Sequence, residues 1–393
     1  MFQRLIKKMP KYLISGIAPG KGGVGALVKS LDSRKNVFNY SSIYVRNPSV
    51  SISSLLKKRK IIDFSFELIL WFWSLFSAQI RMLTMRNNKI ILIYPQYFNS
   101  YILATLVKNN NVALYVMDNS FFCIKSYNYL EGEECTKCIN GTSNINKSCN
   151  PFPKISSTRS SINKINKIKS ISQDMYFLAQ NYQQFSLLKK TFGDRVRGDI
   201  VGMNTGEFCH QPAVSKKYGY DIVYHGSSDD AKGIMYVLKL AKHLKQYSFL
   251  LPVSPNVKKN ELPNIHFEEC TWSSGLKEFT INARLILCPS IWSSPVESSL
   301  LKSIAYNGNV AVYDNKLGFQ NEIDPKVLLR LNSDISLSSE IIDKFMKSSC
   351  DNSFYAKKWL RSYCSDLDDK KIFEWDSNCS DLTNLDTKIR KYN

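Results

Sequence analysis

Negative charge and histidine are scarce in this sequence. It carries 33 Asp and Glu against 53 Lys and Arg, with only 4 His, so its formal net charge is +20 at pH 7. A surplus of this size indicates an anionic partner: nucleic acid, a phosphorylated ligand or an anionic membrane. The sequence lacks a zinc finger of the two-Cys-two-His type, an RRM signature and a basic leucine zipper. We therefore expect no nucleic-acid partner.

Long apolar runs are also lacking. The clean run from Leu68 to Ile80 has 13 residues, and a spanning helix needs about 20. Residues 61–84 thus have two interpretations, a buried helix or a helix that lies on a membrane surface. The basic start of the chain leads only into a short apolar stretch, interrupted by Gly16 and Pro19. We expect a first strand there and no secretory leader.

Ten cysteines occur in a long chain for which we expect a reducing compartment, so they are predicted to be thiols or metal ligands rather than disulfides. Four of them form one CxxC pair with a flanking cysteine on each side, at Cys123, Cys135, Cys138 and Cys149. A structural Cys₄ zinc site and free thiols are both open interpretations.

Strand-like apolar segments alternate with helix-like segments in two series, which predicts two parallel sheets covered by helices. Two such domains would place a cleft between the sheets, with ligands at the carboxyl ends of the strands. Residues 154–173 are polar and basic and predict an exposed loop or irregular helix. The expected organisation is an N-terminal Rossmann-like domain (1–205) with a cysteine-containing insertion (119–173), a linker (206–219), a C-terminal Rossmann-like domain (220–365) and a tail (366–393).

A glycine-rich loop, GIAPGKGGVGALVKSL at 16–31, follows the first predicted strand and opens a helix. A P-loop needs Lys and then Ser or Thr after its last glycine, whereas Ala26 and Leu27 stand here, which argues against a P-loop ATPase. The glycines, Gly22 and Gly23 among them, would let backbone amides approach an anion at the helix N-terminus. A tight turn without a ligand is the alternative.

Two segments of the second half favour a bound diphosphate. Lys232 stands at the predicted start of the helix after IVYHGSSDDAKG, where the helix dipole disfavours a cation unless an anion is present. In CPSIWSSPVESSLLKSIA, a helix is predicted to begin at Pro295 with Ser294 as its N-cap. The amides of its first turn, near Val296–Ser299, would form an anion site. Glu297 either complements the dipole or binds a ligand hydroxyl.

These segments resemble the donor domain of family-four glycosyltransferases of the GT-B fold, over about residues 221–323. The glycine-rich loop and the segment from Asp118 to Cys123, followed by Cys135 and Cys138, are similar to N-terminal motifs of the same family. The resemblance implies an α/β GT-B fold with two Rossmann-like domains. It implies retaining transfer of a sugar from a nucleotide-diphosphate donor to a glycan or lipid-linked acceptor, in surface polysaccharide or O-antigen-type biosynthesis, without a required metal or other cofactor.

The resemblance also assigns roles to residues. It implies that Lys232 and the amides at Glu297–Ser299 hold the leaving diphosphate, and that Asp118 orients the acceptor. A capping aspartate at a strand end is the alternative for Asp118. The residues that the resemblance places in contact with the donor are Ser227, Ser228, Lys232, Glu297, Ser298 and Ser299.

The chain departs from the family pattern at several positions. Ser294 and Lys302 occupy the positions of the family's two glutamates, and Ser227 replaces an arginine. Met117 stands where the family has a histidine, and Glu297 where it has a glycine. These departures keep open two further hypotheses: a non-catalytic GT-B protein that binds a sugar nucleotide or glycan, and a nucleotide-dependent epimerase.

The basic character fits a cytoplasmic enzyme at the inner face of the cell membrane that works on a lipid-diphosphate-linked glycan. A solvated basic loop is the alternative. The residues expected to touch an anionic membrane are Lys154, Arg159, Lys164, Lys167 and Lys169.

Overall fold

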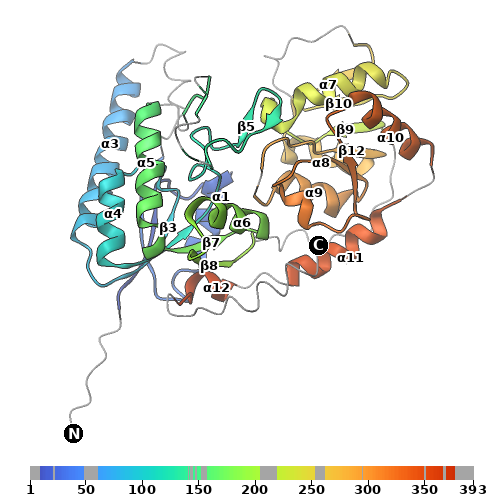
Figure 1. Ribbon diagram of the computed structural model, residues 1–393. Helices are drawn as coiled ribbons and strands as arrows, with labels where there is room; N and C mark the ends of the chain where they lie inside the picture. Colours follow the sequence, from blue (N-terminus) through green and yellow to red (C-terminus); the bar gives the residue numbers. More distant parts are fainter. Residues whose placement is uncertain are drawn as a thin grey trace. The chain divides into compact units, whose positions relative to one another are not determined.

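The computed structural model places the chain in two compact units (Figure 1). The first consists of Met1–Ser126, Lys137–Val201 and Asp368–Asn393, and the second of Tyr127–Thr136 and Gly202–Leu367. The residues that the structure describes are 9–20, 23–47, 61–139, 141, 145–146, 148–151, 157–203, 219–252, 262–293, 295–348, 351–365 and 369–376.

The first unit is built on a parallel six-stranded sheet of order β2-β1-β3-β4-β7-β8. Its central strands are apolar throughout because helices cover both faces, as the continuous apolar runs predicted. Its strands are β1 (Lys11–Ser15), β2 (Ser41–Tyr44), β3 (Lys89–Ile93), β4 (Asn111–Tyr115), β7 (Tyr176–Ala179) and β8 (Arg197–Ile200). Its helices are α1 (Gly23–Arg34), α3 (Ile61–Thr84), α4 (Ser100–Asn109), α5 (Thr158–Ile171), α6 (Tyr182–Phe192) and α12 (Asp369–Phe373).

One face of this sheet is completed by the end of the chain. The core on that face joins Val28 and Leu31 of α1 to Phe373 and Trp375. Phe373 stacks on Phe38 with ring centroids 4.5 Å apart, and its carbonyl accepts a hydrogen bond from the Tyr40 hydroxyl at 2.8 Å. The sequence assigned residues 366–393 to a separate tail, whereas α12 belongs to the first unit. Its apolar residues are too few and too far from that unit in sequence for any periodicity to reveal this.

The second unit is built on another parallel six-stranded sheet, of order β11-β10-β9-β12-β13-β14. One core cluster lies under α7 and α10, the other under α8, α9 and α11. The strands are β9 (Ile222–Tyr224), β10 (Phe249–Leu251), β11 (Ile265–Phe267), β12 (Leu285–Leu287), β13 (Val310–Tyr313) and β14 (Leu328–Leu331). The helices are α7 (Ile234–His243), α8 (Leu276–Asn282), α9 (Ser298–Tyr306), α10 (Ile335–Lys347) and α11 (Ser353–Ser365).

A short hairpin, β5 (Tyr129–Leu130) and β6 (Glu133–Glu134), belongs to the second unit although it comes from the first half of the chain. Its turn, Glu131-Gly132, has positive φ at both residues, the geometry that a two-residue hairpin favours. The sequence placed the whole insertion 119–173 in the N-terminal domain. The expected linker, 206–219, lies outside the described residues except for Gly219.

One further element differs from expectation. Where an irregular segment was expected, α5 is a regular helix, because Ser157 caps it by accepting from the Ser160 amide at 3.1 Å and Ile165 and Ile168 are buried. The second unit ends in two separate helices, α10 and α11. The short helical turns are η1 (Pro95–Tyr97), η3 (Ser172–Asp174), η4 (Asp230–Lys232), η5 (Trp272–Ser274) and η6 (Phe319–Glu322).

We predict that Phe373→Ala lowers the free energy of unfolding of the first unit by about 3–5 kcal/mol, because it leaves a cavity between α1 and the sheet. Chemical denaturation followed by tryptophan fluorescence measures this. The adjacent exposed Glu374→Ala is the control and should change stability by less than about 0.5 kcal/mol. Equal effects of the two substitutions would contradict the packing role of α12.

Candidate functional site

The second sheet has a switch point between β9 and β12, where the strand order reverses direction. Ligands of open parallel sheets bind beyond the carboxyl ends of the strands at such a point. The chain leaves β9 as His225-Gly226-Ser227-Ser228 and leaves β12 as Cys288-Pro289-Ser290. The predicted donor segments therefore follow the two strands that flank the switch point.

A glycine allows these two segments to meet. Gly233 has φ +85°, and a Cβ there would lie 2.2 Å from the carbonyl oxygen of Pro289. Any other residue would therefore clash with backbone and adopt a strained conformation. The Ile291 amide also donates to the Ala231 carbonyl at 2.9 Å. The turn η4, which ends at Lys232, is thereby fixed beside the segment that follows β12.

This contact places Lys232 against Glu297. The Lys232 ammonium donates to Glu297 Oε1 at 2.6 Å, and the Ser290 hydroxyl donates to the same oxygen at 2.7 Å. The ammonium also lies 4.6 Å from the centroid of the Trp292 ring, within the range of a cation–π contact. A buried carboxylate is thus paired with a cation that keeps part of its surface exposed.

The charges of this pair set the protonation of Glu297. Burial raises the pKa of its carboxyl, but the Lys232 ammonium and hydrogen bonds from Lys232, Ser290 and Ser299 outweigh burial. The net pKa of Glu297 is below its ordinary value, so the group is an anion at neutral pH. Sequence reasoning named both Lys232 and Glu297 but did not anticipate that they bind each other.

The helix after this segment begins later than predicted. Glu297 is the N-cap of α9, and its side chain makes no capping hydrogen bond. The carboxylate binds the side chains of Lys232 and Ser299 instead of a backbone amide of the helix, and α9 begins with Ser298 and Ser299. The helix start expected at Pro295 is therefore wrong by three residues. The proposed cap, Ser294, lies outside the described residues.

The other predicted donor residues lie close in sequence to this pair. Ser227 and Ser228 are exposed directly after β9, and the Ser227 carbonyl accepts a hydrogen bond from the Tyr224 hydroxyl at 2.7 Å. Ser298 is exposed at the start of α9 and Ser299 is half-buried. Ser299 is joined to the site by its hydrogen bond to Glu297.

A buried histidine that sequence reasoning did not name lies beside the site. His225 Nδ1 is 2.9 Å from the Ser303 hydroxyl, and its ring stacks on Trp272 with centroids 5.2 Å apart. Because the Ser303 hydroxyl donates to the Ser299 carbonyl at 2.9 Å, we assign the His225 proton to Nδ1. Burial, aided by the Lys302 cation, lowers the pKa of His225 to about 4.

Glu134 of the hairpin is a second residue that sequence reasoning missed. Its carboxylate accepts hydrogen bonds from the Ser293 hydroxyl at 2.7 Å and from the amides of Lys316 and Leu317 at 2.9 and 3.1 Å. Tyr127 packs edge-on against Trp292 with ring centroids 4.9 Å apart. The hairpin is therefore held next to the aromatic ring that contacts Lys232. No sequence pattern predicts this because the partners are more than 150 residues apart.

The first unit contains the predicted acceptor residue. Asp118 follows β4 and accepts hydrogen bonds from the Ser120 amide at 2.9 Å and from the Gln96 side chain at 3.1 Å. Burial raises the pKa of its carboxyl, and hydrogen bonds from Ser120, Ser126 and Gln96 only partly offset this. The Asp118 side chain is half-buried, and its bond with the Ser120 amide is the contact that the capping interpretation expects.

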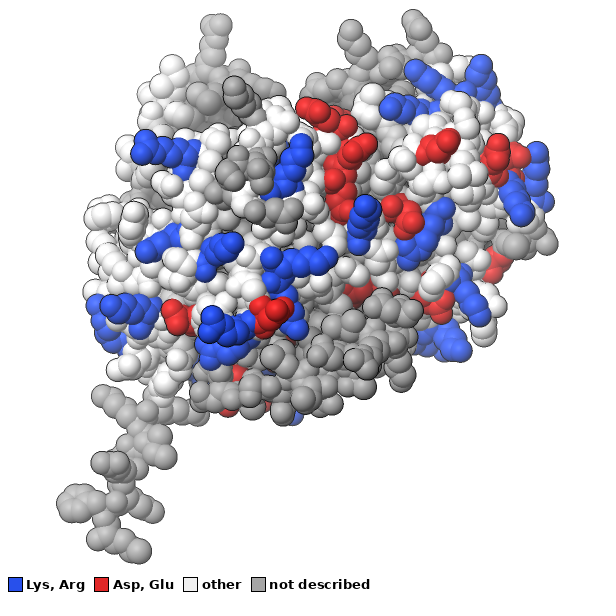
Figure 2. All heavy atoms as spheres, viewed as in Figure 1, with Lys and Arg blue, Asp and Glu red and all other residues white. Residues whose placement is uncertain are grey.

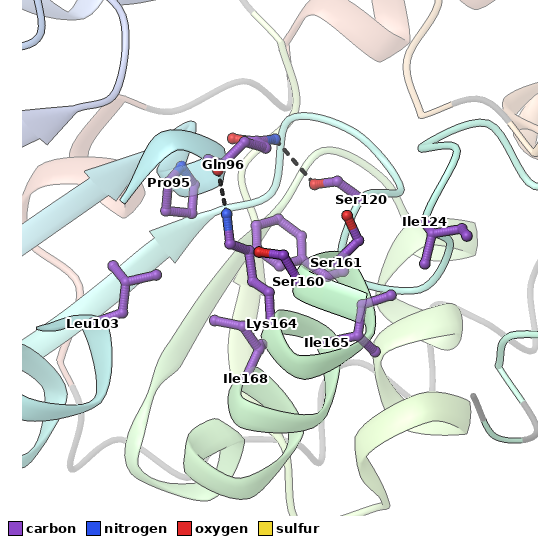
Figure 3. A pocket seen from close by; sticks show the side chains of 11 residues that line it. Pro95, Gln96, Leu103, Ser120, Ile124, Ser160, Ser161, Lys164, Ile165 and Ile168 are labelled. Atoms are coloured by element: carbon purple, nitrogen blue, oxygen red, sulfur yellow. Dashed lines mark hydrogen bonds between the residues drawn. The ribbon is translucent and has the colours of Figure 1, made fainter. Parts of the chain in front are cut away.

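A small hollow is lined in part by Gln96 and Ser120, the two residues that donate to Asp118 (Figure 3). It has a volume of about 20 Å³, room for one water molecule, and Lys164 of α5 points into it. The Lys164 ammonium donates to the Gln96 carbonyl, and burial lowers its pKa to about 8. The sequence analysis expected Lys164 to contact a membrane. Its ammonium is instead bound and largely buried inside the first unit, so that prediction is wrong for this residue. Lys154, from the same prediction, lies outside the described residues.

The glycine-rich loop closes on itself. The Gly20 amide donates to the Gly25 carbonyl at 2.9 Å, and a Cβ at Gly25 would lie 3.1 Å from Gly20 backbone atoms. Gly23 has φ +51° and faces open space, while Gly22 lies outside the described residues. Gly20 and Gly25 therefore form a tight turn. The predicted anion site would have to be formed by the backbone amides at the start of α1.

The four cysteines are divided between the units. Cys123, Cys138 and Cys149 belong to the first unit and Cys135 to the second. A hydrogen bond with the Cys123 thiol, together with burial, raises the pKa of Cys138. Within the described ranges, no group of three or more His, Cys, Asp or Glu side chains is placed to hold a metal ion.

No family model matches the sequence, and no curated protein matches it. Solved structures do match. A structure described as trehalose-6-phosphate from E. coli bound with UDP-2-fluoro glucose is 10% identical, with a TM-score of 0.55 over 97% of this chain and 98% of that one. WaaG, described as a glycosyltransferase involved in lipopolysaccharide biosynthesis, is 12% identical, with a TM-score of 0.52 over 93% and 97%. The chain has the GT-B fold.

A further match is partial. A chain of the GtfA/B complex is 12% identical, with a TM-score of 0.50, and this protein covers 61% of that chain while 81% of this protein is matched. At these identities the likeness establishes the GT-B fold and no more. The chemistry has to be argued from the residues of this chain.

The chain has the GT-B fold although Ser294 and Lys302 stand where the family-four pattern that it resembles has two glutamates. Lys302 stands at the second acid position on α9, and its ammonium lies 4.9 Å from the centroid of the Trp272 ring. It therefore faces the same indole on which His225 stacks. A cation and a neutral imidazole share the ring beside the position where the family pattern has a carboxylate.

We predict that the free-energy difference between the wild type and His225→Gln depends on pH. Below about pH 6.5 the unfolded chain binds a proton at His225, whereas the folded chain does not until its pKa of about 4, so wild-type stability falls with pH in this window. At pH 7.5 the His225→Gln variant should be less stable than the wild type. The difference between their free energies of unfolding should then narrow by about 2 kcal/mol as the pH falls to 5.

Urea unfolding at the two pH values measures this gap. His243→Gln, at an exposed position on α7, is the matched control and should shift stability by less than about 0.5 kcal/mol. A gap for His225→Gln that does not change with pH would mean that the imidazole titrates normally and is not shielded by the fold.

Proposed function

We propose that this protein is a glycosyltransferase that moves a sugar from a nucleotide-diphosphate donor to a glycan or lipid-linked acceptor. The observation that carries the proposal is Lys232 beside the start of α9 at the switch point of the second sheet. A cation and a helix N-terminus at such a point form an anion site, and a diphosphate is an anion of matching charge. The GT-B fold is the scaffold on which such a site is expected.

The chemistry follows from where charge develops. As the bond between the sugar and the diphosphate breaks, negative charge accumulates on the leaving phosphate, and donors fixed in advance stabilise it. Lys232 has three N–H donors, one of which binds Glu297. We propose that the others, with the amides of Ser298 and Ser299, bind the leaving group. No metal is needed for this role, so we propose a metal-independent reaction.

Glu297 and Asp118 would then act on the two sugars. Glu297 is held ionised by Lys232 and Ser290, and can accept a hydrogen bond from a donor hydroxyl through its second oxygen. Asp118, whose pKa is raised by burial, would orient the acceptor hydroxyl. We propose retention at the anomeric carbon, with the leaving phosphate accepting the acceptor's proton. A cytoplasmic role in surface polysaccharide or O-antigen-type assembly fits this chemistry.

A second candidate is a GT-B protein that binds a sugar nucleotide or glycan without turnover. The Lys232–Glu297 pair favours it, because the carboxylate neutralises part of the cation that would hold a diphosphate. The two candidates differ in one measurement. Purified protein incubated with a panel of UDP-, GDP- and TDP-sugars yields free nucleoside diphosphate if it is a transferase, with water or sugar as acceptor, and yields only binding if it is not.

The transferase proposal predicts that nucleoside diphosphate release continues in the presence of EDTA and that the product keeps the anomeric configuration of the donor. Release is followed by chromatography and configuration by proton NMR. Inversion would contradict the retaining mechanism, and activity that EDTA abolishes and Mg²⁺ restores would contradict metal independence.

We further predict that Lys232→Ala lowers kcat by about 10²–10³-fold, because one preorganised donor to the leaving group is lost. Lys239→Ala, which removes an exposed lysine of α7 a few residues away, is the control and should leave kcat unchanged. Thermal unfolding checks that both variants are folded. A folded Lys232→Ala variant with wild-type kcat would place the leaving group elsewhere.

A further inference from the structure

Three polar side chains of the helix α3, those of Glu67, Ser74 and Gln79, make contacts with the rest of the first unit. Glu67 is buried and accepts a salt bridge from Arg46 at 3.2 Å, and the Ser74 hydroxyl accepts from the Arg46 amide at 2.9 Å. The Gln79 side chain accepts from the Asn99 amide at 2.8 Å. These contacts, with the buried Leu75, fix the helix to the rest of the first unit.

The outward side of α3 is apolar along its whole length. We define the outer face as seven residues spaced alternately four and three apart, so that they form one stripe about 30 Å long. Their exposed fractions run from 40% at Leu83 to 85% at Ile62. They are Ile62, Phe66, Ile69, Trp73, Phe76, Ile80 and Leu83. No charged side chain interrupts the stripe.

A contiguous apolar surface of this size marks a place where a partner binds. Each exposed Phe, Trp or Ile side chain would gain about 1.5–3 kcal/mol on leaving water. By length and composition α3 could cross a membrane, because it has 24 residues and contains an 18-residue window with a mean hydropathy of 1.5. Its inward contacts with Arg46 and Asn99 argue that it lies on a surface instead, because a spanning helix would have to break them.

The charges beside α3 select the partner. Exposed basic residues flank the stripe: Arg81 and Arg86 near the end of α3, and Lys108 at the end of α4. Helix α4 packs between α3 and α5, and α5 adds Lys167 and Lys169 (Figure 1). Figure 2 shows basic side chains over this part of the first unit. In the same three helices, the acidic residues are the exposed Asp63 and the buried Glu67.

This distribution favours lipid over a second copy of the chain. A twofold dimer through α3 would bring the same basic rim against itself, and like charges repel. An anionic bilayer offers both an apolar interior for the stripe and phosphates for the rim. Trp73 and the phenylalanines are side chains that favour the boundary between headgroups and acyl chains.

We propose that the outer face of α3 binds the surface of an anionic lipid bilayer, with Arg81, Arg86, Lys108, Lys167 and Lys169 contacting the lipid phosphates. The helix lies parallel to the membrane and enters the headgroup–acyl boundary. The proposal takes up the membrane-surface interpretation of residues 61–84 and adds basic residues outside the segment 154–173, on which the sequence analysis had placed the basic contact. The proposal does not depend on sugar transfer, although it would bring the enzyme to a lipid-linked acceptor.

The test is flotation of the full-length protein with vesicles of phosphatidylcholine containing 30% phosphatidylglycerol. Trp73→Ser with Phe76→Ser should weaken binding at least about tenfold, because two apolar anchors are lost. The matched control is Phe354→Ser with Tyr355→Ser, an exposed aromatic pair on α11 of the second unit, and it should leave binding unchanged. Wild-type binding by the Trp73/Phe76 variant would overturn the proposal.

Charge is tested separately. Lys167→Gln with Lys169→Gln should weaken binding to the anionic vesicles at low salt and have no effect on pure phosphatidylcholine vesicles. Binding to neutral vesicles as strong as to anionic ones would overturn the role of the basic rim. If sedimentation instead shows a wild-type dimer that Trp73→Ser with Phe76→Ser dissociates, the face is an interface between copies and the membrane proposal fails.

Loss of vesicle binding can be told apart from loss of the proposed glycosyltransferase activity. The substituted side chains are exposed, so thermal unfolding and sugar-nucleotide binding should stay at wild-type levels while vesicle binding is lost. If the double variant unfolds, Ile62→Ser with Phe66→Ser, at the start of the same stripe, carries the same test. A protein that floats with vesicles through α3 but turns over no donor would support the docking surface and contradict the transferase.

Discussion

The candidate site depends on one close backbone approach, in which the turn at Gly233 meets the carbonyl of Pro289. Only a glycine fits there, because its φ is positive and a Cβ would overlap that oxygen. The approach ties the segment after β9 to the segment after β12, and so brings Lys232 to Glu297 and Trp292. The ion pair, the ionisation of Glu297 and the proposed diphosphate contact all follow from it.

The second unit carries carboxylates and cations at other positions than the family-four pattern that the sequence resembles. Glu297 provides a carboxylate from a position where the family has a glycine, and Lys302 stands over Trp272 where an acid is expected. Glu134 comes from a hairpin in the first half of the chain and accepts a hydrogen bond from Ser293. Carboxylates are thus present near the candidate donor site, but they come from different places in the sequence. A GT-B scaffold tolerates this because its backbone pattern rests on strand burial and not on those acids.

The first unit recruits distant apolar residues to one of its faces and leaves large apolar residues exposed on another. Its sheet needs the distant C-terminal residues Phe373 and Trp375 to finish one core, while α3 leaves a stripe of large apolar side chains in solvent. Folding stability explains why Phe373 and Trp375 cover the sheet. It does not explain why the large apolar side chains of α3 are left in solvent. The inward ion pair between Glu67 and Arg46 fixes the rotation of α3, and we propose that the stripe it leaves exposed serves an interaction. The proposed lipid surface would contact both the stripe and its basic rim.

Much of the fold was readable in the sequence, because buried parallel strands such as Lys89–Ile93 and Leu285–Leu287 require continuous apolar runs, and Lys232, Gly233 and Glu297 stand in recognisable segments. The sequence could not give the pairing of Lys232 with Glu297, the burial of Lys164, the docking of Glu134 or the return of the C-terminus to the first unit. Each joins residues far apart in the chain, and local periodicity carries no information about which distant partner a side chain meets. The apolar composition of residues 61–84 was visible from the start, but only the tertiary structure decided which face of that helix is outward, because the ion pair of Glu67 with Arg46 sets its rotation.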